Sequence, residues 1–227
     1  MGCIQIKLTV MQPYFFPYLG YFRLLAASDI LVLLDNVQYQ RRGWVHRNKF
    51  TKLNNTIDWL TLPVTKGHRD TTMVNDVRFK DSVNPYEVIK HFQISKKSTQ
   101  IKEIWPNFFQ FSGNLFEYLQ DTVVVTANIL GLKSKILIAS NIASKGELSG
   151  QDYIIKLCNK LGADTYINAP GGKALYQQEH FQREKIGLFF LPEYAGSKAN
   201  ILERILSEEI TFLRNEIFSN IALEQPL

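Results

Sequence analysis

The sequence has little cysteine. Only Cys3 and Cys158 occur among 227 residues, and they are far apart. Small secreted domains held by disulfides carry several cysteines, and structural zinc sites need cysteines or histidines at short, fixed spacings. Neither class fits this chain. A protein without a cysteine framework is typical of a reducing compartment, which is the first indication of a cytoplasmic protein.

Long apolar runs are also missing. No stretch approaches the roughly 18 consecutive apolar residues that a membrane-spanning helix requires. Near the N-terminus, Gln5, Lys7 and Gln12 interrupt the apolar residues, so we expect no secretory signal there. The chain is therefore predicted to have no membrane span and to be cytoplasmic.

Several catalytic signatures are absent as well. The sequence contains no Walker loop, no Rossmann glycine fingerprint and no metal-ligand spacing. Its four histidines form no recognisable triad with serine and aspartate, and neither His46 nor His68 has a carboxylate at a diagnostic spacing. These absences predict that no metal is bound, and they leave any cofactor unknown.

The charge of the chain is modestly positive. A net charge of +5 suits anionic ligands such as phosphates, nucleotides or nucleic acid, although it also simply aids solubility. Most basic residues are scattered. One local cluster, Arg41, Arg42 and Arg47, lies beside the aromatic residues Tyr39 and Trp44.

Hydrophobic periodicity predicts an α/β fold. Apolar residues 6–11 and 30–35 are typical of buried strands, and residues 19–28 between them of a helix, so the two strands should be parallel. Short strands at 44–50, 58–64 and 74–79 predict a small β-rich insertion at about 44–80. Beyond it we expect helices at 85–92, 109–130, 150–161, 174–185 and 201–218, and strands at 136–139, 165–168 and 187–191.

This order predicts a single α/β domain over residues 1–227, with a mostly parallel sheet flanked by helices. In such sheets, ligands bind at the carboxyl ends of the strands. We therefore expect residues 12–18, 35–48, 140–149 and 169–173 to surround one cleft.

The turn after the first strand is rich in aromatic residues. It leads into a helix whose N-terminus could bind an anion, with Gly20 permitting close backbone approach. The tetrapeptide at 18–21, Tyr-Leu-Gly-Tyr, resembles the His-x-Gly-His signature of nucleotidylyltransferases and class I aminoacyl-tRNA synthetases. Tyrosines replace both histidines and cannot supply a cation. The candidate ligand-binding residues here are Gln12, Tyr14, Tyr18, Gly20 and Tyr21, although the aromatic rings could instead pack the turn.

Asp35 ends the second predicted strand. It could be a base, a partner for a substrate amine, a metal ligand, or a cap for the turn that follows. His46 is the other candidate catalytic residue, as a general acid or base if the fold brings it near Asp35. The alternative for His46 is a structural role in the core.

The remaining candidates are predicted to bind substrate. Arg41, Arg42 and Arg47 could clamp phosphates, or form a solvated basic face. Trp44 could stack on a base or sugar ring, or belong to the core. Lys173, which follows two glycines at the end of a predicted strand, could help to hold an anion. The polar residues Gln38 and Asn48 complete the set.

Four segments of the chain resemble the WbqC-like protein family, which is found in bacterial surface-polysaccharide gene clusters. They are QPYFFPYLGYF at 12–22, SDILVLLDNVQYQRRGWVHRN at 28–48, WLTLPV at 59–64 and LGADTYINAPGG at 161–172. The C-terminal end departs from the family pattern, with Glu203 near the position where an Asp is expected. The predicted helix at 201–218 is therefore divergent.

The resemblance implies a cytoplasmic enzyme of O-antigen biosynthesis that transfers an aminoacyl group, such as glycyl, to a nucleotide-linked amino sugar. Such a reaction needs ATP or another aminoacyl donor, and the partner carrying the acyl group would be a tRNA or a carrier protein. The alternative is a non-catalytic module that binds a nucleotide sugar or RNA.

Overall fold

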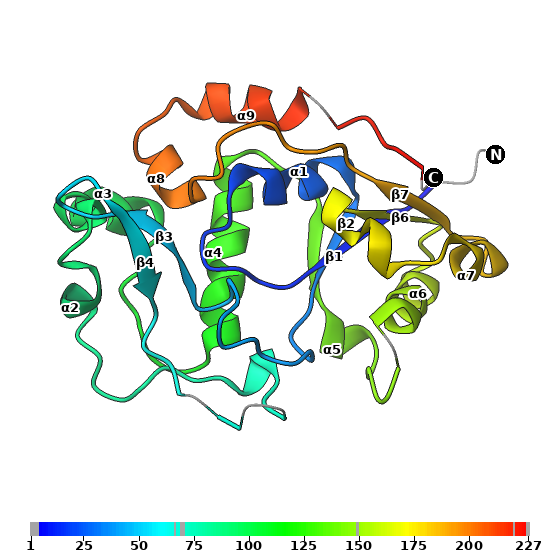
Figure 1. Cartoon of the computed structure of the whole chain (residues 1–227), viewed down its shortest axis with the longest axis horizontal. Helices are drawn as coiled ribbons and strands as arrows, with labels where there is room; N and C mark the ends of the chain where they lie inside the picture. The colour runs from blue at the N-terminus through cyan, green and yellow to red at the C-terminus, as the bar shows by residue number, and fades with distance from the viewer. Residues whose placement is uncertain (1–4, 66, 69–70, 149, 220, 226–227) are drawn as a thin grey trace.

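Five parallel strands form the central sheet of the computed structural model, which describes residues 5–65, 67–68, 71–148, 150–219 and 221–225. The strands lie in the order β5-β2-β1-β6-β7 (Figure 1). Their bounds are β1 Lys7–Met11, β2 Ile30–Leu33, β5 Lys135–Ile138, β6 Thr165–Asn168 and β7 Gly187–Phe190. The predicted α/β class and parallel sheet are confirmed.

Helices cover both faces of this sheet, because alternate strand residues are apolar on each side. Leu31 and Leu33 of β2 pack with α1 (Leu19–Ala27) and α4 (Leu115–Ile129). Val32 packs on the opposite face with α6 (Gly150–Leu161) and α7 (Gln178–Arg183). In Figure 1, α1 and α9 (Ile210–Phe218) lie above the sheet, while α5 (Ala139–Ile142) and α6 lie below it.

The sheet has a topological switch point beside its central strand. The chain runs outward from β1 through β2 to β5, then crosses over to β6 and β7 on the other side of β1. Ligands of open α/β sheets bind in the crevice at such a reversal, outside the carboxyl ends of the strands. Gln12 follows β1 at this edge, and Ala169 follows β6.

The connection from β2 to β5 carries the insertion. It begins with an antiparallel hairpin, β3 (Arg47–Thr51) and β4 (Ile57–Thr61), in which Arg47 pairs with Thr61. A 3₁₀ turn (Val74–Asp76), α2 (Pro85–Ile89), a second 3₁₀ segment (Gln93–Lys97) and α3 (Ser98–Ile104) follow before α4. The insertion is thus less β-rich than its sequence predicts.

The prediction of a strand at 74–79 is wrong for the first half of that range, which forms a 3₁₀ turn. Asp76 accepts a hydrogen bond from the backbone N–H of Met73 at 3.0 Å, which closes a turn instead of an extended strand. Phe79 does pair, through an isolated bridge to Val64.

Four predicted helices differ from the observed ones by more than one residue, and the first of them, expected at 85–92, ends at Ile89. Asn114 accepts hydrogen bonds from two following backbone N–H groups and starts α4 at Leu115 rather than at 109. The helix expected at 174–185 is shorter, since residues 170–175 form a 3₁₀ segment. The helix expected at 201–218 is two helices, α8 (Ile201–Ile205) and α9, with a break at residues 206–209.

Cys158 is a free cysteine in the core. Cys158 is fully buried on α6, and burial raises the pKa of its thiol to about 12. Cys3 lies outside the described residues. None of the helices within the described ranges combines the length and apolar character needed to cross a bilayer. In the same ranges, no three His, Cys, Asp or Glu side chains are grouped closely enough to hold a metal ion.

Candidate functional site

The aromatic turn at 12–18 and the segment at 35–48 lie at the same edge of the sheet. Met11 pairs with Leu33 in parallel register, so Gln12 and Asp35 both follow the carboxyl ends of neighbouring strands. Further along, the backbone N–H of Phe15 donates to the carbonyl of Trp44 at 3.0 Å. The two segments that the sequence singles out are therefore in direct contact.

Asn48 holds this contact together. Its side-chain amide is buried and donates to the carbonyls of Phe15 and Phe16, at 2.9 and 2.8 Å. Phe16 has a positive φ of 44°, a strained conformation for a bulky residue. Asn48 thus stabilises the turn, and its amide is already engaged.

The tyrosines of this region are engaged within the protein. The Tyr21 hydroxyl donates to the carbonyl of Gln12 at 3.1 Å, and the Tyr14 ring lies 5.9 Å from that of Tyr21. Burial raises the pKa of Tyr14, Tyr18 and Tyr21, so all three stay neutral at physiological pH. A Cβ on Gly20 would lie 2.2 Å from the Tyr18 ring. The space beside the Gly20 backbone, where the sequence predicts a closely approaching ligand, is therefore filled by the Tyr18 ring.

Asp35 is 3% exposed, and both of its carboxylate oxygens are occupied. One accepts the backbone N–H of Ser140 at 2.9 Å, and the other accepts the side-chain amide of Asn75 at 3.2 Å. This carboxylate joins the end of β2 to the start of α5 and to the 3₁₀ turn at Val74–Asp76. Its carboxylate therefore joins distant segments, instead of capping the turn that follows it in the chain.

A cationic hollow of about 420 Å³ lies beside this edge, and we call it the basic pocket. One wall comes from the segment after β2, and the other from the end of β4 and the chain that follows it. The pocket is lined by Tyr39, Arg41, Arg42, His46, Lys80 and residues 61–65. Among the described residues that line the pocket there is no aspartate or glutamate, so the electrostatic potential that they create favours an anion.

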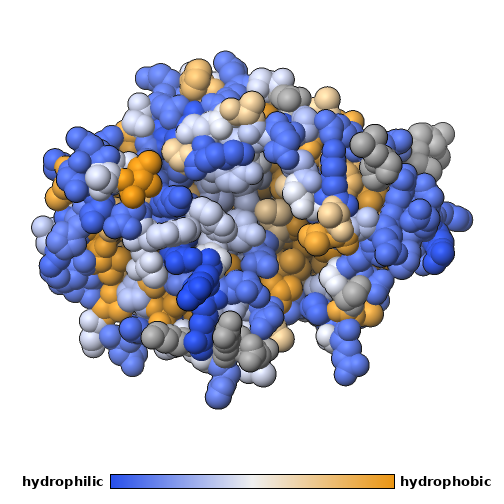
Figure 2. Space-filling view, viewed as in Figure 1, coloured by the Kyte–Doolittle hydropathy of each residue, from blue (hydrophilic) through white to orange (hydrophobic). Residues whose placement is uncertain are grey.

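The surface of this face agrees with that arrangement. In Figure 2, strongly hydrophilic residues gather over the segment that joins β2 to β3. Apolar surface lies next to them, in the middle of the face, over β1 and the end of β2. A polar region and an apolar one therefore meet at the carboxyl edge of the sheet.

The three predicted arginines play different roles. Arg47 donates to the carbonyls of Arg42 and Gly43, at 2.5 and 3.2 Å, and so braces the loop. Arg41 donates to the carbonyl of Gly67 at 2.5 Å. Within the described residues, the side chains of Arg42 and Lys80 have no hydrogen-bond or ion-pair partner. These two cations are the ones most available to a ligand.

His46 lines the basic pocket but is only 8% exposed. Its ring packs edge-on against Tyr39, with centroids 5.3 Å apart, and its Nδ1 has no hydrogen-bond partner among the described residues. Burial, with Arg47 as a second cause, lowers the pKa of His46 to about 4. At neutral pH the ring is therefore uncharged and can accept a proton or a hydrogen bond.

Three other predicted residues lie apart from the pocket lining. Trp44 is 45% exposed and packs against Trp59. Gln38 is exposed and pairs through its backbone with Met73. Lys173 forms an ion pair with Glu224 at 2.8 Å, so its charge is already balanced.

Sequence reasoning missed Lys80 and the role of residues 61–65. Their position depends on pairing between distant segments, in which the N–H of Lys80 donates to the carbonyl of Pro63 at 2.9 Å. The WLTLPV segment was a signal, because it contains Thr61, Leu62 and Pro63 of the pocket wall. Nothing in local spacing pointed to Lys80.

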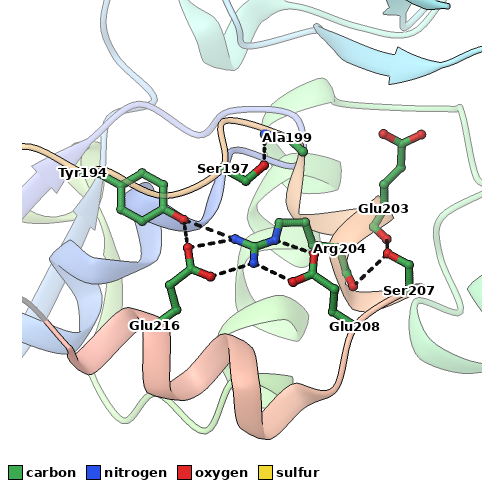
Figure 3. Close-up of polar contacts among 8 residues, drawn as sticks. All are labelled: Tyr194, Ser197, Ala199, Glu203, Arg204, Ser207, Glu208 and Glu216. Carbon is green, nitrogen blue, oxygen red and sulfur yellow. Dashed lines mark hydrogen bonds and ion pairs between the residues drawn. The ribbon is translucent and has the colours of Figure 1, made fainter.

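The C-terminal segment contacts the hairpin beside the site. Asn200 is fully buried and donates to the carbonyl of Lys49 at 2.9 Å, while Glu203 accepts the N–H of Thr51 at 2.8 Å. Both contacts hold β3. Figure 3 shows the neighbouring cluster, in which Arg204 binds Glu208, Glu216 and Tyr194. The Tyr194 ring in turn packs on Tyr18, 5.5 Å away.

Comparison with known proteins identifies relatives of this chain. A family model described as "WbqC-like protein family" matches residues 12–198. "Uncharacterized protein Rv1507c" of Mycobacterium tuberculosis (strain ATCC 25618 / H37Rv) is 36% identical over 58 residues, which are 26% of this chain and 25% of that protein. The chain thus matches about a quarter of that relative's length. No solved structure matches the chain significantly.

Proposed function

The chain belongs to the WbqC-like protein family, and on that premise we propose that it transfers an aminoacyl group, of the glycyl type, to a nucleotide-linked amino sugar. The product would serve the assembly of a bacterial surface polysaccharide such as O-antigen. The basic pocket is the observation that carries this proposal, because it gathers cations beside the segment that follows β2, and none of its described lining residues is a carboxylate.

The pocket suits the diphosphate of a sugar nucleotide. Arg42 and Lys80 approach from opposite walls and are not neutralised by described residues. Arg41 is tied to the Gly67 carbonyl by one nitrogen and keeps other donors of its guanidinium. A hydrogen bond to a charged group contributes roughly 1.5–3 kcal/mol, so each cation should matter to affinity.

The transfer step needs a proton acceptor. The sugar nitrogen attacks the acyl carbon and forms an amide bond, while the bond between the acyl carbon and its carrier breaks. The nitrogen must lose a proton, which ends on the leaving group. His46 is neutral and lines the pocket, so we assign it this proton transfer.

Asp35 is the second candidate for this role. Its carboxylate is buried and already accepts two hydrogen bonds, which favours a part in positioning the sheet edge over one as the base. The acyl group would come from ATP-dependent activation, or from a carrier such as a tRNA or carrier protein.

Binding and transfer are tested separately. UDP and dTDP, free and linked to amino sugars, are titrated by calorimetry against the protein and its variants. Arg42→Ala and Lys80→Ala should each weaken binding about tenfold or more. Arg183→Ala and Lys160→Ala remove exposed charges from α7 and α6 and should change nothing. Unchanged affinity in both pocket variants would refute the diphosphate site.

Transfer is then assayed with radiolabelled aminoacyl donors and amino-sugar nucleotides. His46→Gln should reduce turnover by roughly 100-fold with little effect on nucleotide affinity, if the proton-transfer role holds. Asp35→Asn, compared at matched thermal stability, decides between the two residues. Transfer that survives both substitutions would eliminate acid–base catalysis by this pair.

A non-catalytic nucleotide-sugar binding module is the second candidate function. It is favoured by the lining of the basic pocket, because none of the described lining residues is a carboxylate that could complete an acid–base pair with His46. Binding of sugar nucleotides without transfer from any donor would support it. RNA binding would instead show a steep fall in affinity as salt concentration rises.

A further inference from the structure

Three side chains pack against one another next to the basic pocket. The rings of Trp44 and Trp59 lie 4.9 Å apart and are tilted by 50°, and the Arg47 guanidinium lies 4.1 Å from the centre of the Trp59 ring. We call these three residues the aromatic shelf. Trp44 forms its outer side, because it is 45% exposed whereas Trp59 is partly covered.

The shelf is held from several directions. Arg47 binds the carbonyls of Arg42 and Gly43, and the Trp44 carbonyl accepts the N–H of Phe15 from the aromatic turn. The backbone at residues 42–44 is therefore fixed on both sides. A rigid aromatic ring loses little entropy when a ligand stacks on it.

The same loop also enters the basic pocket. Arg42 lines that pocket and Trp44 is two residues further along, so their Cα atoms are within about 7 Å of each other. A nucleotide presents a planar base and a charged phosphate at a comparable separation. One loop therefore offers a stacking surface and a cation in the order that a nucleotide requires.

We propose that Trp44 is the stacking platform for the nucleobase of the ligand whose phosphates occupy the basic pocket. This inference rests on the proposed function for the phosphate site and adds the base site to it. The charge around the shelf supports a nucleotide, because Arg47 and Lys49 both approach Trp59, the latter at 5.8 Å. An apolar peptide would gain nothing from these cations.

The experiment uses tryptophan fluorescence. The chain has three tryptophans, of which Trp105 is only 1% exposed, so a ligand that stacks on Trp44 should quench the emission of an accessible ring. The probes are UDP, dTDP, uridine 5′-diphospho-N-acetylglucosamine and inorganic pyrophosphate. We expect the nucleotides to quench, while pyrophosphate binds, as measured by calorimetry, with little quenching.

Substitution of Trp44 then gives the decisive comparison. Base–aromatic stacking contributes roughly 1–3 kcal/mol, so Trp44→Ala should weaken UDP about tenfold or more and leave pyrophosphate unchanged. Trp44→Phe should keep most of the affinity. Ile57→Ala is the matched control, because Ile57 is an apolar residue that is 70% exposed and lies on β4, the strand that carries Trp59.

The remaining outcomes distinguish failure of the base site from failure of the phosphate site. If wild-type protein binds UDP and Trp44→Ala binds it equally well, the base site is wrong while the phosphate site stands. If Trp44→Ala weakens the sugar nucleotide but not UDP, the ring stacks on the sugar and the assignment to the base is overturned. If wild-type protein binds neither UDP nor pyrophosphate, the proposed function fails, and this inference fails with it.

Discussion

Gly20 makes room for Tyr18 at the start of α1. A Cβ at this position would lie 2.2 Å from the Tyr18 ring, which is itself packed against Tyr194 and the Lys198 ammonium. We predict that Gly20→Ala lowers the free energy of unfolding by about 1–3 kcal/mol, through overpacking. Urea denaturation measures the change.

The control for this prediction is Gly171→Ala, where no atom lies within 4 Å of the added Cβ. A double-mutant cycle with Tyr18→Ala tests the cause, because removing the ring should remove most of the cost of Gly20→Ala. An equal cost in both backgrounds would show that the clash is not the source.

His46 should make the stability of the fold depend on pH. Its pKa is lowered to about 4 in the folded protein and is about 6.5 when unfolded, so the unfolded chain binds more protons between these values. Stability should therefore fall as pH drops from about 6.5 towards 4 and be unaffected by this group above 6.5. The difference is on the order of 3 kcal/mol.

The variant His46→Gln isolates this effect from the other histidines. Its unfolding free energy, measured in urea from pH 4 to 7.5, should decline less steeply below pH 6.5 than that of the wild type. Parallel pH profiles for the two proteins would mean that His46 titrates normally in the fold.

At single residues, the sequence predicts which side chains could bind a ligand better than it predicts which of them are already bonded within the fold. Arg41, Arg42 and His46 were expected at a site, and they do line one pocket. Asn48 was expected to bind ligand, but its amide is used by the carbonyls of Phe15 and Phe16. Such partners are more than 30 residues away in the chain, so local spacing contains no trace of them.

At the level of elements, a single arginine ties together α8, α9 and the segment before them. Arg204 on α8 is 4% exposed and binds Glu208 at 2.6 Å and Glu216 of α9 at 2.7 Å (Figure 3). Its Nη1 also binds the Tyr194 hydroxyl at 3.2 Å. Hydrogen bonding to Glu208 raises the pKa of Arg204, and hydrogen bonding to Arg204 lowers the pKa of Glu216.

We predict that Arg204→Met lowers the free energy of unfolding by about 2 kcal/mol or more at pH 7. The substitution leaves two partly buried carboxylates without their cation, and their partial exposure reduces the cost. Because the pKa of Glu216 is lowered in the fold, its contribution is present above its unfolded pKa and is lost as pH falls through the folded value. The cost of Arg204→Met should therefore shrink below about pH 4.

Urea denaturation at pH 7 and at pH 3.5 measures both parts of this prediction. The matched control is Arg183→Met, which removes an exposed arginine on α7. An equal loss of stability at the two pH values would mean that Arg204 stabilises the fold through packing of its aliphatic stem and not through its ion pairs.

Elements stabilised by local pattern were predicted well. The first strand, helix and second strand follow from apolar periodicity, and the bounds of α6 and β6 match their expected ranges. The helix expected at 201–218 failed because its apolar spacing continues across the break between α8 and α9. Both helices bury apolar residues in one core, including Leu202 and Leu213, so the periodicity does not reveal the interruption.

At the scale of the whole molecule, one apolar cluster connects the insertion to the sheet. It contains Phe15 of the aromatic turn, Phe50 and Leu60 of the hairpin, Leu119 of α4 and Leu202 of α8. The basic pocket is built on this cluster, between the segment after β2 and the chain after β4. Melting of the insertion should therefore destroy the pocket and expose one side of the sheet.

We predict a single thermal unfolding transition, raised by nucleotide. A ligand that binds only the folded state adds about 2.7 kcal/mol at a hundred times its Kd. For a chain of this size, that corresponds to a rise in Tm of roughly 5–10 °C. Scanning calorimetry with saturating UDP should show it for the wild type and for Arg183→Ala, and a much smaller rise for Arg42→Ala at the same UDP concentration. Two separate transitions would contradict the single domain that the sequence predicts, and an equal rise in all three proteins would place the nucleotide outside the basic pocket.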